Sequence, residues 1–360
     1  METAQLIKRA GQGRWDETRA WAWYDKQPWR VGCNFIPSRA INQLEMWQAD
    51  SFDRVEIDRE LGWLEDLGMN TVRVYLHDLL WKEDSGRFLA RIDQFLGIAA
   101  LHNIAVMFVF FDSCWFPYPE LGRQRPPTPH RHNSHWVQSP GAAILRDARA
   151  FAALEGYVTG VVEHFRDDPR IFAWDIWNEP DNCGSDGREG LTVEEKTRLV
   201  TPYLADSFQW ARAGRPSQPL TSAIWQGDWV PDEKMIPLHQ VQVFGSDIIS
   251  FHRYLSLEET RATVEPLKRW GRPLLCTEYL ARGAGSTFEA ILPYFHREKI
   301  AAYNWGAVSG KTQTIYPWDS GSKTYTSEPE VWHHDIFRPD GTPYDSRETE
   351  LIKSLLKPGA

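Results

Sequence analysis

Two glutamates close apolar segments of similar design, and they are the residues best placed to do chemistry. Residues 171–180 read IFAWDIWNEP, so Glu179 follows a largely apolar run and precedes Pro180. Proline cannot donate to a sheet ladder and biases the preceding residue toward an extended conformation, which predicts an extended Glu179 at the end of a strand. Residues 272–280, RPLLCTEYL, end in the same way on Glu278. A buried carboxylate is costly unless it has a partner or a chemical role.

A pair of carboxyl groups at the ends of two strands suits acid–base chemistry on a glycosidic bond. Retaining glycosidases hold such groups about 5–5.5 Å apart, with one as the nucleophile and the other as the acid/base. The nucleophile must stay ionised, and Arg73 and the hydroxyl of Tyr254 would support its charge. The acid must keep its proton near neutral pH, which a dry position beside Trp177 favours. We expect neither a metal nor a cofactor, since the HRHNSH stretch at 130–135 has no standard metal spacing.

The tryptophan content points to a class of ligand. The chain has 18 tryptophans in 360 residues, more than a core needs, and many lie in expected loops. Indole faces stack on the C–H faces of sugar rings, so this composition favours a carbohydrate. Trp115 and Trp136 are candidate sugar platforms, and we expect about half of the loop tryptophans to be packing residues instead.

Eight apolar segments alternate with helical patterns along the chain. Strands are expected at residues 29–37, 70–77, 104–112, 171–178, 219–228, 247–254, 272–280 and 300–309. Helices are expected at residues 16–24, 53–67, 142–165, 257–270, 287–299 and 345–356, and after the capping box that Thr192 and Glu195 form. This alternation predicts an α/β protein with a closed (β/α)8 TIM barrel at residues 29–357, behind a lead-in segment at 1–28.

The catalytic residues of such a barrel come from the C-terminal ends of its strands. Polar and aromatic residues gather at those ends in this sequence, while the strand bodies are apolar. They are Asn34, Arg73, His77, Asp112, Asn178, Glu179, Trp225, His252, Tyr254, Glu278 and Trp305. We therefore expect them to converge on one pocket.

Several of these motifs together resemble a known group of enzymes. WNEP at 177–180, TEY at 277–279, TVRV at 71–74, FHRY at 251–254 and Trp305 are similar to clan A of the glycoside hydrolases, and closest to family five. The resemblance spans residues 29–309. The WNEP motif alone is moderately specific, but the motifs in this order are strongly so.

The resemblance implies a role for each matching residue. Glu179 resembles the acid/base and Glu278 the nucleophile, with Asn178 bonding the sugar 2-hydroxyl. Arg73 and Tyr254 resemble the electrostatic supports of the nucleophile. His252 resembles a partner near the acid/base, and Trp305 resembles the platform under the sugar at the cleaved position.

One feature departs from the family pattern. Family five places a histidine soon after the third strand, whereas this strand closes as FFDSCW, with Asp112 and Trp115. His77, His132 or His135 could take over that contact. The long segments at 113–141 and 310–340 are expected to be functional loops. His333 and His334, in the second of them, are expected to form a surface or loop pair.

Composition excludes several other classes of protein. The net charge of −9 argues against nucleic-acid binding. No run of about 18 apolar residues occurs, so no segment is expected to span a membrane. The four cysteines lack CxxC spacing and predict free thiols. The N-terminus lacks the apolar core of a signal peptide, which favours the cytoplasm, or secretion or the periplasm if a leader was removed.

Alternatives to a retaining hydrolase of β-linked oligo- or polysaccharides remain open on the sequence. An exo-acting β-glycosidase on short imported oligosaccharides would share these residues, and so would a transglycosylase. A non-catalytic carbohydrate-binding barrel would retain the tryptophans but lose a glutamate. The loops at 113–141 and 310–340 could leave a cleft open at both ends or close a pocket, so endo and exo action are both compatible with the sequence.

Overall fold

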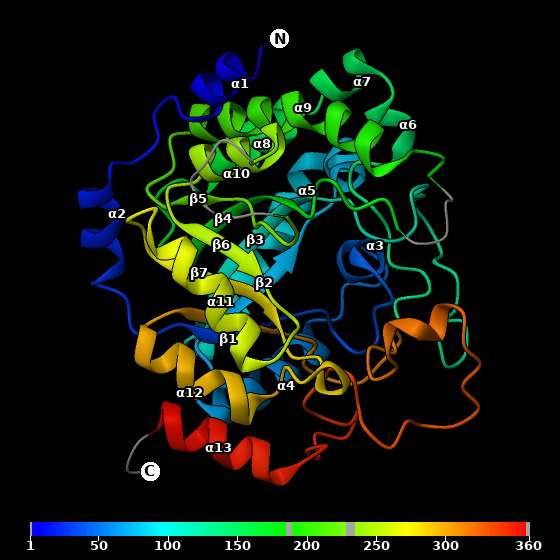
Figure 1. Ribbon diagram of the computed structural model, residues 1–360. Helices are drawn as coiled ribbons and strands as arrows, with labels where there is room; N and C mark the ends of the chain where they lie inside the picture. The colour runs from blue at the N-terminus through cyan, green and yellow to red at the C-terminus, as the bar shows by residue number, and fades with distance from the viewer. Residues whose placement is uncertain (1, 185–188, 228–234, 358–360) are drawn as a thin grey trace.

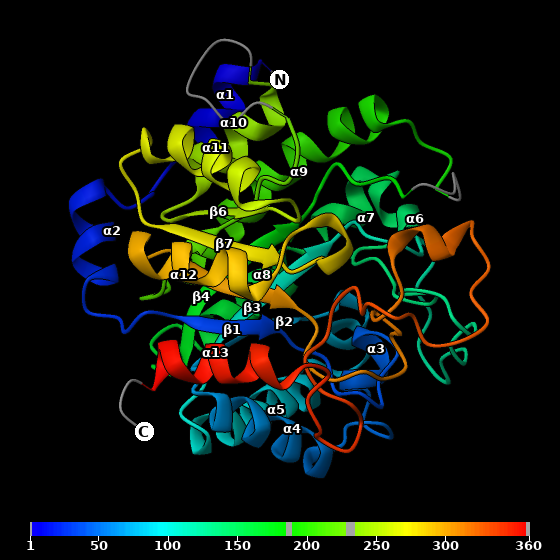
Figure 2. The same ribbon diagram turned by 60° about the horizontal axis from the view of Figure 1, so that its bottom comes forward.

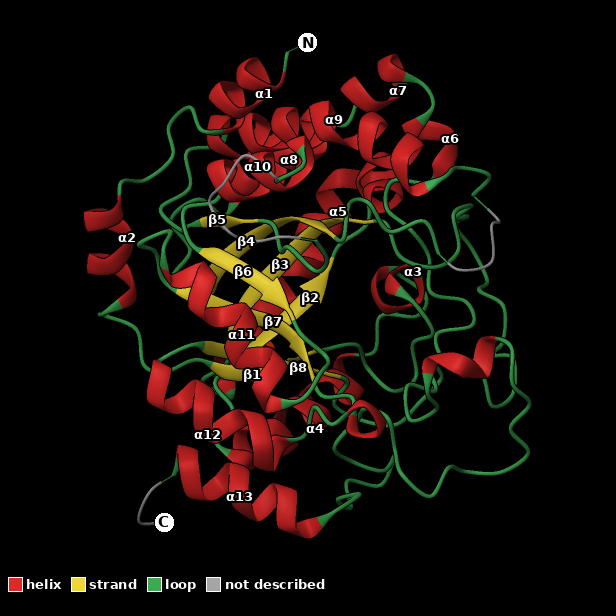
Figure 3. Ribbon diagram, in the orientation of Figure 1, coloured by secondary structure: helices red, strands yellow, loops and turns green. Residues whose placement is uncertain are grey.

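The computed structural model describes residues 2–184, 189–227 and 235–357 as a parallel eight-stranded sheet with helices around it (Figures 1 and 3). Its hydrogen-bonded order is β5-β4-β3-β2-β1-β8-β7-β6. The strands are β1 (Val31–Asn34), β2 (Thr71–Tyr75), β3 (Ala105–Asp112), β4 (Ile171–Asn178), β5 (Leu220–Thr221), β6 (Ile249–His252), β7 (Leu274–Tyr279) and β8 (Ala301–Trp305). The predicted (β/α)8 barrel is confirmed.

One seam of the barrel is held by very little pairing. The strand expected at 219–228 is only the two residues of β5, and β5 and β6 are not neighbours in the hydrogen-bonded sheet. Closure instead comes from an isolated bridge between Ile224 and Phe251, in which the Ile224 N–H donates to the Ser250 carbonyl at 3.2 Å. The Thr221 and Ser250 hydroxyls also meet across the seam at 2.6 Å.

Helices surround the sheet and begin at side-chain caps in several places. They are α1 (Thr3–Ala10), α2 (Glu17–Tyr24), α3 (Gln43–Trp47), α4 (Arg54–Leu67), α5 (Asp78–Leu101), α6 (Ala142–Leu145), α7 (Ala148–Ala152), α8 (Glu155–His164), α9 (Val193–Ala213), α10 (Pro237–Gly245), α11 (Leu257–Lys268), α12 (Phe288–Glu298) and α13 (Ser346–Leu356), with 3-10 turns η1 (Arg282–Ala284) and η2 (Trp318–Gly321). The capping box of Thr192 and Glu195 is present at α9.

The single helix expected at 142–165 is wrong, because that segment contains α6, α7 and α8. The Asp147 carboxylate accepts hydrogen bonds from the backbone N–H groups of Arg149 and Ala150. This is the contact of an N-cap, so the chain restarts a helix at Ala148 instead of continuing one. Apolar periodicity alone does not reveal such a restart.

In the described chain, no helix combines the length and apolar character that crossing a membrane requires.

The α2 part of the N-terminal segment covers the end of the barrel where the strands begin, opposite the long loops, whereas α1 packs against α9 and α10 (Figure 2). Tyr24 of α2 belongs to a buried cluster with Met107 of β3, Phe172 of β4 and Tyr303 of β8. The Tyr24 hydroxyl donates to the Lys299 carbonyl at 2.6 Å. The bottom of the barrel is therefore filled by aromatic side chains.

Asp247 ties this N-terminal segment to the sheet. Its side chain is fully buried and accepts from the backbone N–H of Trp15 at 2.7 Å and of Leu220 at 2.8 Å. Arg212 of α9 lies 3.0 Å from the same carboxylate. One acidic group thus joins the lead-in segment, β5 and a barrel helix.

We predict that Asp247→Ala lowers the free energy of unfolding by about 3 kcal/mol, because two buried N–H groups and a guanidinium would lose their acceptor. Urea unfolding followed by circular dichroism measures the change. Arg347→Ala is the control, since Arg347 pairs with Asp345 on the surface and its loss should leave the midpoint unchanged. Equal midpoints for Asp247→Ala and wild type would contradict the assignment.

Candidate active site

The two glutamates meet at the C-terminal end of the barrel. Glu179 directly follows β4, Glu278 lies in β7, and His252 ends β6. A carboxylate oxygen of each glutamate and a ring nitrogen of His252 all lie within 4.8 Å of one another, and all three residues are buried. Two acids far apart in sequence therefore face each other at close range. The spacing agrees with the short separation of retaining glycosidases.

Glu278 is surrounded by hydrogen-bond donors. One of its oxygens accepts from Arg73 Nη1 and from the Tyr75 hydroxyl, each at 3.0 Å, and the other accepts from the Tyr254 hydroxyl at 2.7 Å. Burial raises the pKa of Glu278 and the nearby Glu179 adds to the rise, whereas Arg73 and the Tyr254 hydroxyl act to lower it. Since an ionised carboxylate only accepts hydrogen bonds, these donors favour its charged form.

Arg73 is held in place by several further partners. It is fully buried, and its Nε and Nη2 donate to one oxygen of Asp175 at 3.1 and 2.8 Å. It also donates to the side-chain oxygens of Asn34 and Asn178, each at 2.8 Å. Asp175 thus bonds within the barrel.

Glu179 has a different environment from Glu278. One of its oxygens lies 2.8 Å from His252 Nδ1, and the other accepts from Asn182 Nδ2 at 2.7 Å and from the Cys114 thiol at 3.2 Å. Burial is the main cause that raises the pKa of Glu179 to about 7. Burial likewise lowers the pKa of His252 to about 4, so the ring is neutral near pH 7. The two carboxyls therefore differ in the charge of their neighbours.

The backbone at Glu179 departs from the predicted extended conformation. Its φ is +43°, in the left-handed region that residues with a Cβ seldom adopt. The prediction from Pro180 was wrong because the chain turns sharply directly after β4. This turn brings Asn182 back to the Glu179 carboxylate, through the 2.7 Å bond from Asn182 Nδ2 and a 2.9 Å bond from its N–H to the Glu179 carbonyl. Strained backbone of this kind is common at functional sites.

A cavity of about 500 Å³ opens over the two glutamates. Eight of the residues proposed from sequence line it, namely Trp115, His132, Asn178, Glu179, Trp225, Tyr254, Glu278 and Trp305. The other lining residues are Cys114, Asn133, Asp181, Asn182, Cys183, Gly184, Val193, Gln226, Trp318 and His334. The strand ends thus converge as expected, and loops supply the rest of the wall.

Arg73, Asp112 and His252 do not line the cavity but orient residues that do. Asp112 accepts from Asn178 Nδ2 at 3.0 Å and from Trp136 Nε1 at 2.6 Å. Burial raises the pKa of Asp112 to about 6. Asn178 is therefore fixed from both sides, with its amide nitrogen on Asp112 and its oxygen on Arg73.

His77 and Trp136 lie outside this cavity. The buried His77 ring caps α5, accepting from the Leu79 N–H at 3.2 Å, and its other nitrogen donates to the Gln138 carbonyl at 3.1 Å. With both nitrogens engaged, His77 has no means to bind a substrate. The Trp136 ring packs edge-on against Tyr75 and Trp305, so it supports the site from behind.

Some wall residues carried a signal in the sequence and others did not. Tyr75 lies two residues after Arg73 on β2, so strand alternation could have placed both side chains on the interior face. Asn182 and Cys114 come from irregular loop turns that no periodic pattern predicts. His333 and His334, expected to form a surface or loop pair, lie in a loop but are buried. The His334 Nδ1–H donates to the Leu280 carbonyl, which draws the ring inward beside the cavity.

Comparison with known proteins gives matches in structure and none in sequence. No protein-family model matches the chain, and no curated protein matches it. A GH5_18 structure from Bifidobacterium longum has a TM-score of 0.59 at 16% identity, covering 92% of this chain and 80% of its own. A GH5_18 variant from Streptomyces cattleya in complex with Manβ1-4GlcNAc has a TM-score of 0.59 at 12% identity, covering 92% and 81%.

Two further structural matches extend the set. An exo-β-1,4-mannosidase from Opitutaceae bacterium strain TAV5 has a TM-score of 0.58 at 19% identity, covering 91% of this chain and 60% of its own. A β-mannanase from the blue mussel Mytilus edulis has a TM-score of 0.56 at 11% identity, covering 92% of both chains. The chain shares their barrel. The resemblance to family five is thus confirmed at the level of the fold.

The raised pKa of Glu179 predicts a pH-dependent stability. Since the folded chain holds this proton more tightly than the unfolded chain, the linked stabilisation is complete below pH 4.5 and is lost as the pH rises toward about 7. Glu179→Gln cannot ionise and escapes this loss. The free energy of unfolding of wild type relative to Glu179→Gln should therefore fall between pH 4.5 and pH 8 in urea titrations. Parallel pH curves for the two proteins would contradict the raised pKa.

Proposed function

We propose that this chain is a retaining β-glycoside hydrolase. The observation that carries the proposal is the pair of buried carboxyls within 4.8 Å of each other, one beside a guanidinium and the other beside a neutral imidazole. Such unequal environments separate the protonation states of two acids and so separate their roles. Glu278 is the nucleophile and Glu179 the acid/base.

In the first step, Glu278 attacks the anomeric carbon while Glu179 gives its proton to the departing glycosidic oxygen. A covalent glycosyl-enzyme forms on Glu278 and the aglycone leaves. In the second step, the Glu179 carboxylate takes a proton from water, which attacks the same carbon and frees Glu278. A pKa of about 7 lets Glu179 act in both directions near neutral pH.

The positions of the two glutamates indicate which end of the cavity holds the leaving group and which holds the attached sugar. The leaving group must lie on the side of Glu179, where Asp181 anchors the Trp225 indole nitrogen at 2.7 Å. The sugar that becomes attached must lie over Glu278, beside Tyr254 and Trp305. Trp318 also belongs to this second side, since its ring is 5.1 Å from that of Tyr254.

The loops at 113–141 and 310–340 are bound together at the glycone end. The Asn133 N–H donates to the Thr312 carbonyl at 2.8 Å, and His132 Nδ1 donates to the Tyr316 carbonyl at 2.8 Å. Gln313 spans both loops, accepting from the His130 N–H at 2.8 Å and donating to the Thr128 carbonyl at 2.6 Å. This cross-linked wall favours a pocket for a terminal sugar, and hence exo action.

The lining also restricts the kind of sugar. Among the described residues that line the cavity, the charged groups are the carboxylates of Glu179, Glu278 and Asp181, and none is lysine or arginine. An uncharged sugar fits this wall better than a uronic acid. Structural neighbours described as an exo-β-1,4-mannosidase and as a complex with Manβ1-4GlcNAc make β-mannosides the first substrates to test.

A transglycosylase would use the same two steps with a sugar in place of water. It would be recognised by oligosaccharide products longer than the substrate. A non-catalytic carbohydrate-binding barrel is disfavoured because both carboxyls are present and are held by different partners.

We predict that Glu179→Ala and Glu278→Ala each lower kcat by several orders of magnitude while the fold persists. On an activated aryl β-glycoside, azide should restore turnover of both variants, with opposite stereochemistry. Glu179→Ala should give the β-glycosyl azide, because azide attacks the glycosyl-enzyme without a base. Glu278→Ala should give the α-glycosyl azide by direct displacement. NMR of the isolated products distinguishes the two.

Glu189→Gln is a useful control, because Glu189 is a buried acid that pairs with Lys196 away from the two glutamates. It should alter stability and leave the stereochemical outcome unchanged. For the wild type, NMR of the first-formed sugar should show the β anomer. An α anomer would contradict the retaining mechanism. Near-normal rates in either alanine variant would show that the substituted glutamate is not catalytic.

Exo action makes a separate prediction about products. The substrates are β-linked oligosaccharides of two to six units whose reducing end has been chemically reduced. The first product should be the monosaccharide from the non-reducing end, since the loop wall blocks longer glycones. Chromatography of early time points measures this. Early release of internal fragments of two or more sugars would show that the cavity is open at both ends.

A further inference from the structure

Asn133 occupies an unusual position in the wall of the cavity. Its backbone is fixed on both sides, because its N–H donates to the Thr312 carbonyl at 2.8 Å and its carbonyl accepts from the Trp136 N–H at 3.2 Å. Its φ is +42°, in the left-handed region that asparagine and glycine tolerate better than other residues. The loop thus presents this side chain in one defined place.

The side-chain amide of Asn133 makes no hydrogen bond within the described part of the protein. The residue is 1% exposed, yet neither its side-chain oxygen nor its side-chain nitrogen has a hydrogen-bond partner among the described residues. A primary amide can donate two hydrogen bonds and accept two. Leaving such a group buried and unpaired costs about 1–3 kcal/mol. A cost of this size calls for a compensating contact.

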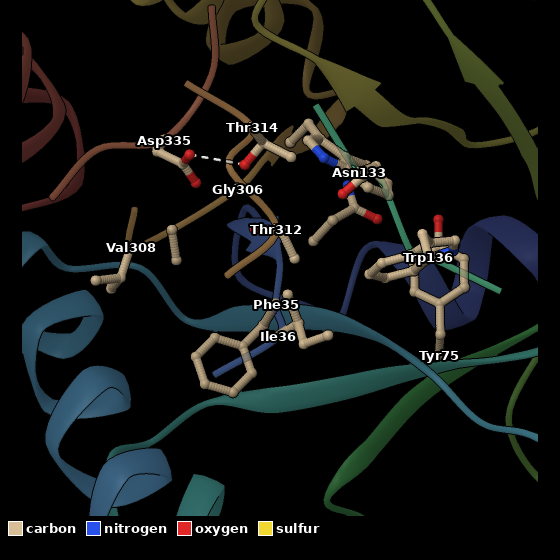
Figure 4. Close-up of a pocket in the computed structure, with 13 residues that line it drawn as sticks. Phe35, Ile36, Tyr75, Asn133, Trp136, Gly306, Val308, Thr312, Thr314 and Asp335 are labelled. Carbon is tan, nitrogen blue, oxygen red and sulfur yellow. Dashed lines mark hydrogen bonds between the residues drawn. The ribbon is translucent and has the colours of Figure 1, made fainter. Parts of the chain in front are cut away.

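Asn133 and Trp305 are the two described residues that line both the large cavity and a small one of about 10 Å³ behind it. Figure 4 shows Asn133 in the lining of the small cavity, together with Thr312, Thr314 and Trp136. The amide therefore lies at the glycone end, beside the proposed sugar platform. A ligand resting on Trp305 would come within reach of it.

The same wall offers acceptors from neutral histidines. His132 donates its Nδ1 proton to the Tyr316 carbonyl, so the other ring nitrogen is an acceptor. Burial lowers the pKa of His132 to about 3, which keeps the ring uncharged. His334, which likewise gives its Nδ1 proton to a carbonyl, has a buried Nε2 without a partner among the described residues. Sugar hydroxyls are the donors that suit such a surface.

We propose that Asn133 is a specificity-determining residue whose amide bonds a hydroxyl of the terminal sugar held over Glu278. This inference rests on the proposed hydrolase function and adds the contact that selects the sugar. A site that hydrogen-bonds a substrate hydroxyl discriminates against an analogue lacking that hydroxyl, because the polar group of the site is then left unpaired. The rival role is a purely structural one, with the amide bonded to a single water in the small cavity, which has room for about one.

Asn133→Gly tests the proposal, since glycine accepts the left-handed φ and removes the amide alone. Wild type and variant are assayed on an aryl β-glycoside that the wild type cleaves, and on its 2-, 3-, 4- and 6-deoxy analogues. We expect kcat/KM of the variant on the parent glycoside to fall about 10- to 100-fold. On one deoxy analogue the two enzymes should become equal, which identifies the bonded hydroxyl.

Asn103→Gly is the matched control, because Asn103 has a φ of +57° and lies outside the cavity lining. It should leave kcat/KM unchanged on every substrate. Asn133→Gly with unchanged kcat/KM, or with equal losses on all deoxy analogues, would overturn the proposal and leave a structural role. Failure of the wild type to cleave any β-glycoside would instead overturn the proposed function, so the two failures are distinguishable.

Discussion

The site depends on a single buried cation, the guanidinium of Arg73. Asp175 holds two of its nitrogens, and its remaining donors reach Glu278, Asn178, Asn34 and the Tyr75 hydroxyl. A fully buried charge is tolerated only when it is paired and hydrogen-bonded, so these partners must be present together. The same group therefore assembles the ends of β1, β2, β4 and β7 and sets the electrostatics of Glu278, the proposed nucleophile.

The contrast between the two glutamates follows from that placement. Arg73 lies against Glu278, whereas Glu179 faces a histidine that burial keeps neutral. Desolvation acts on both carboxyls, but only one has a permanent cation at hydrogen-bonding distance. In the proposed mechanism, the strand ends beneath the cavity thus give the two glutamates different roles, and the loops above it select the substrate.

The difference between the strand scaffold and the loops explains which features could be predicted from the sequence. Strand bodies and strand-end residues were predictable because period-two alternation and terminal motifs such as WNEP are local signals. The inward turn of His334, the left-handed φ of Glu179 and the unpaired amide of Asn133 were not. The first and third depend on contacts between segments distant in sequence, such as the bond from Asn133 to the Thr312 carbonyl, and the second on the irregular turn that brings Asn182 back to Glu179. The prediction of a single helix at 142–165 was wrong for a local reason, because Asp147 caps a new helix within that segment.

The weak seam between β5 and β6 gives the two ends of the cavity different mechanical character. Trp225, on the proposed leaving-group side, directly follows Ile224, whose bridge to Phe251 closes the barrel. Trp305, on the proposed glycone side, ends β8, which pairs with β1 over four consecutive residues. Backbone pairing thus holds Trp305 more firmly than Trp225. For the proposed hydrolase, the leaving-group wall can therefore adjust to aglycones of varied shape while the platform under the attached sugar keeps its place.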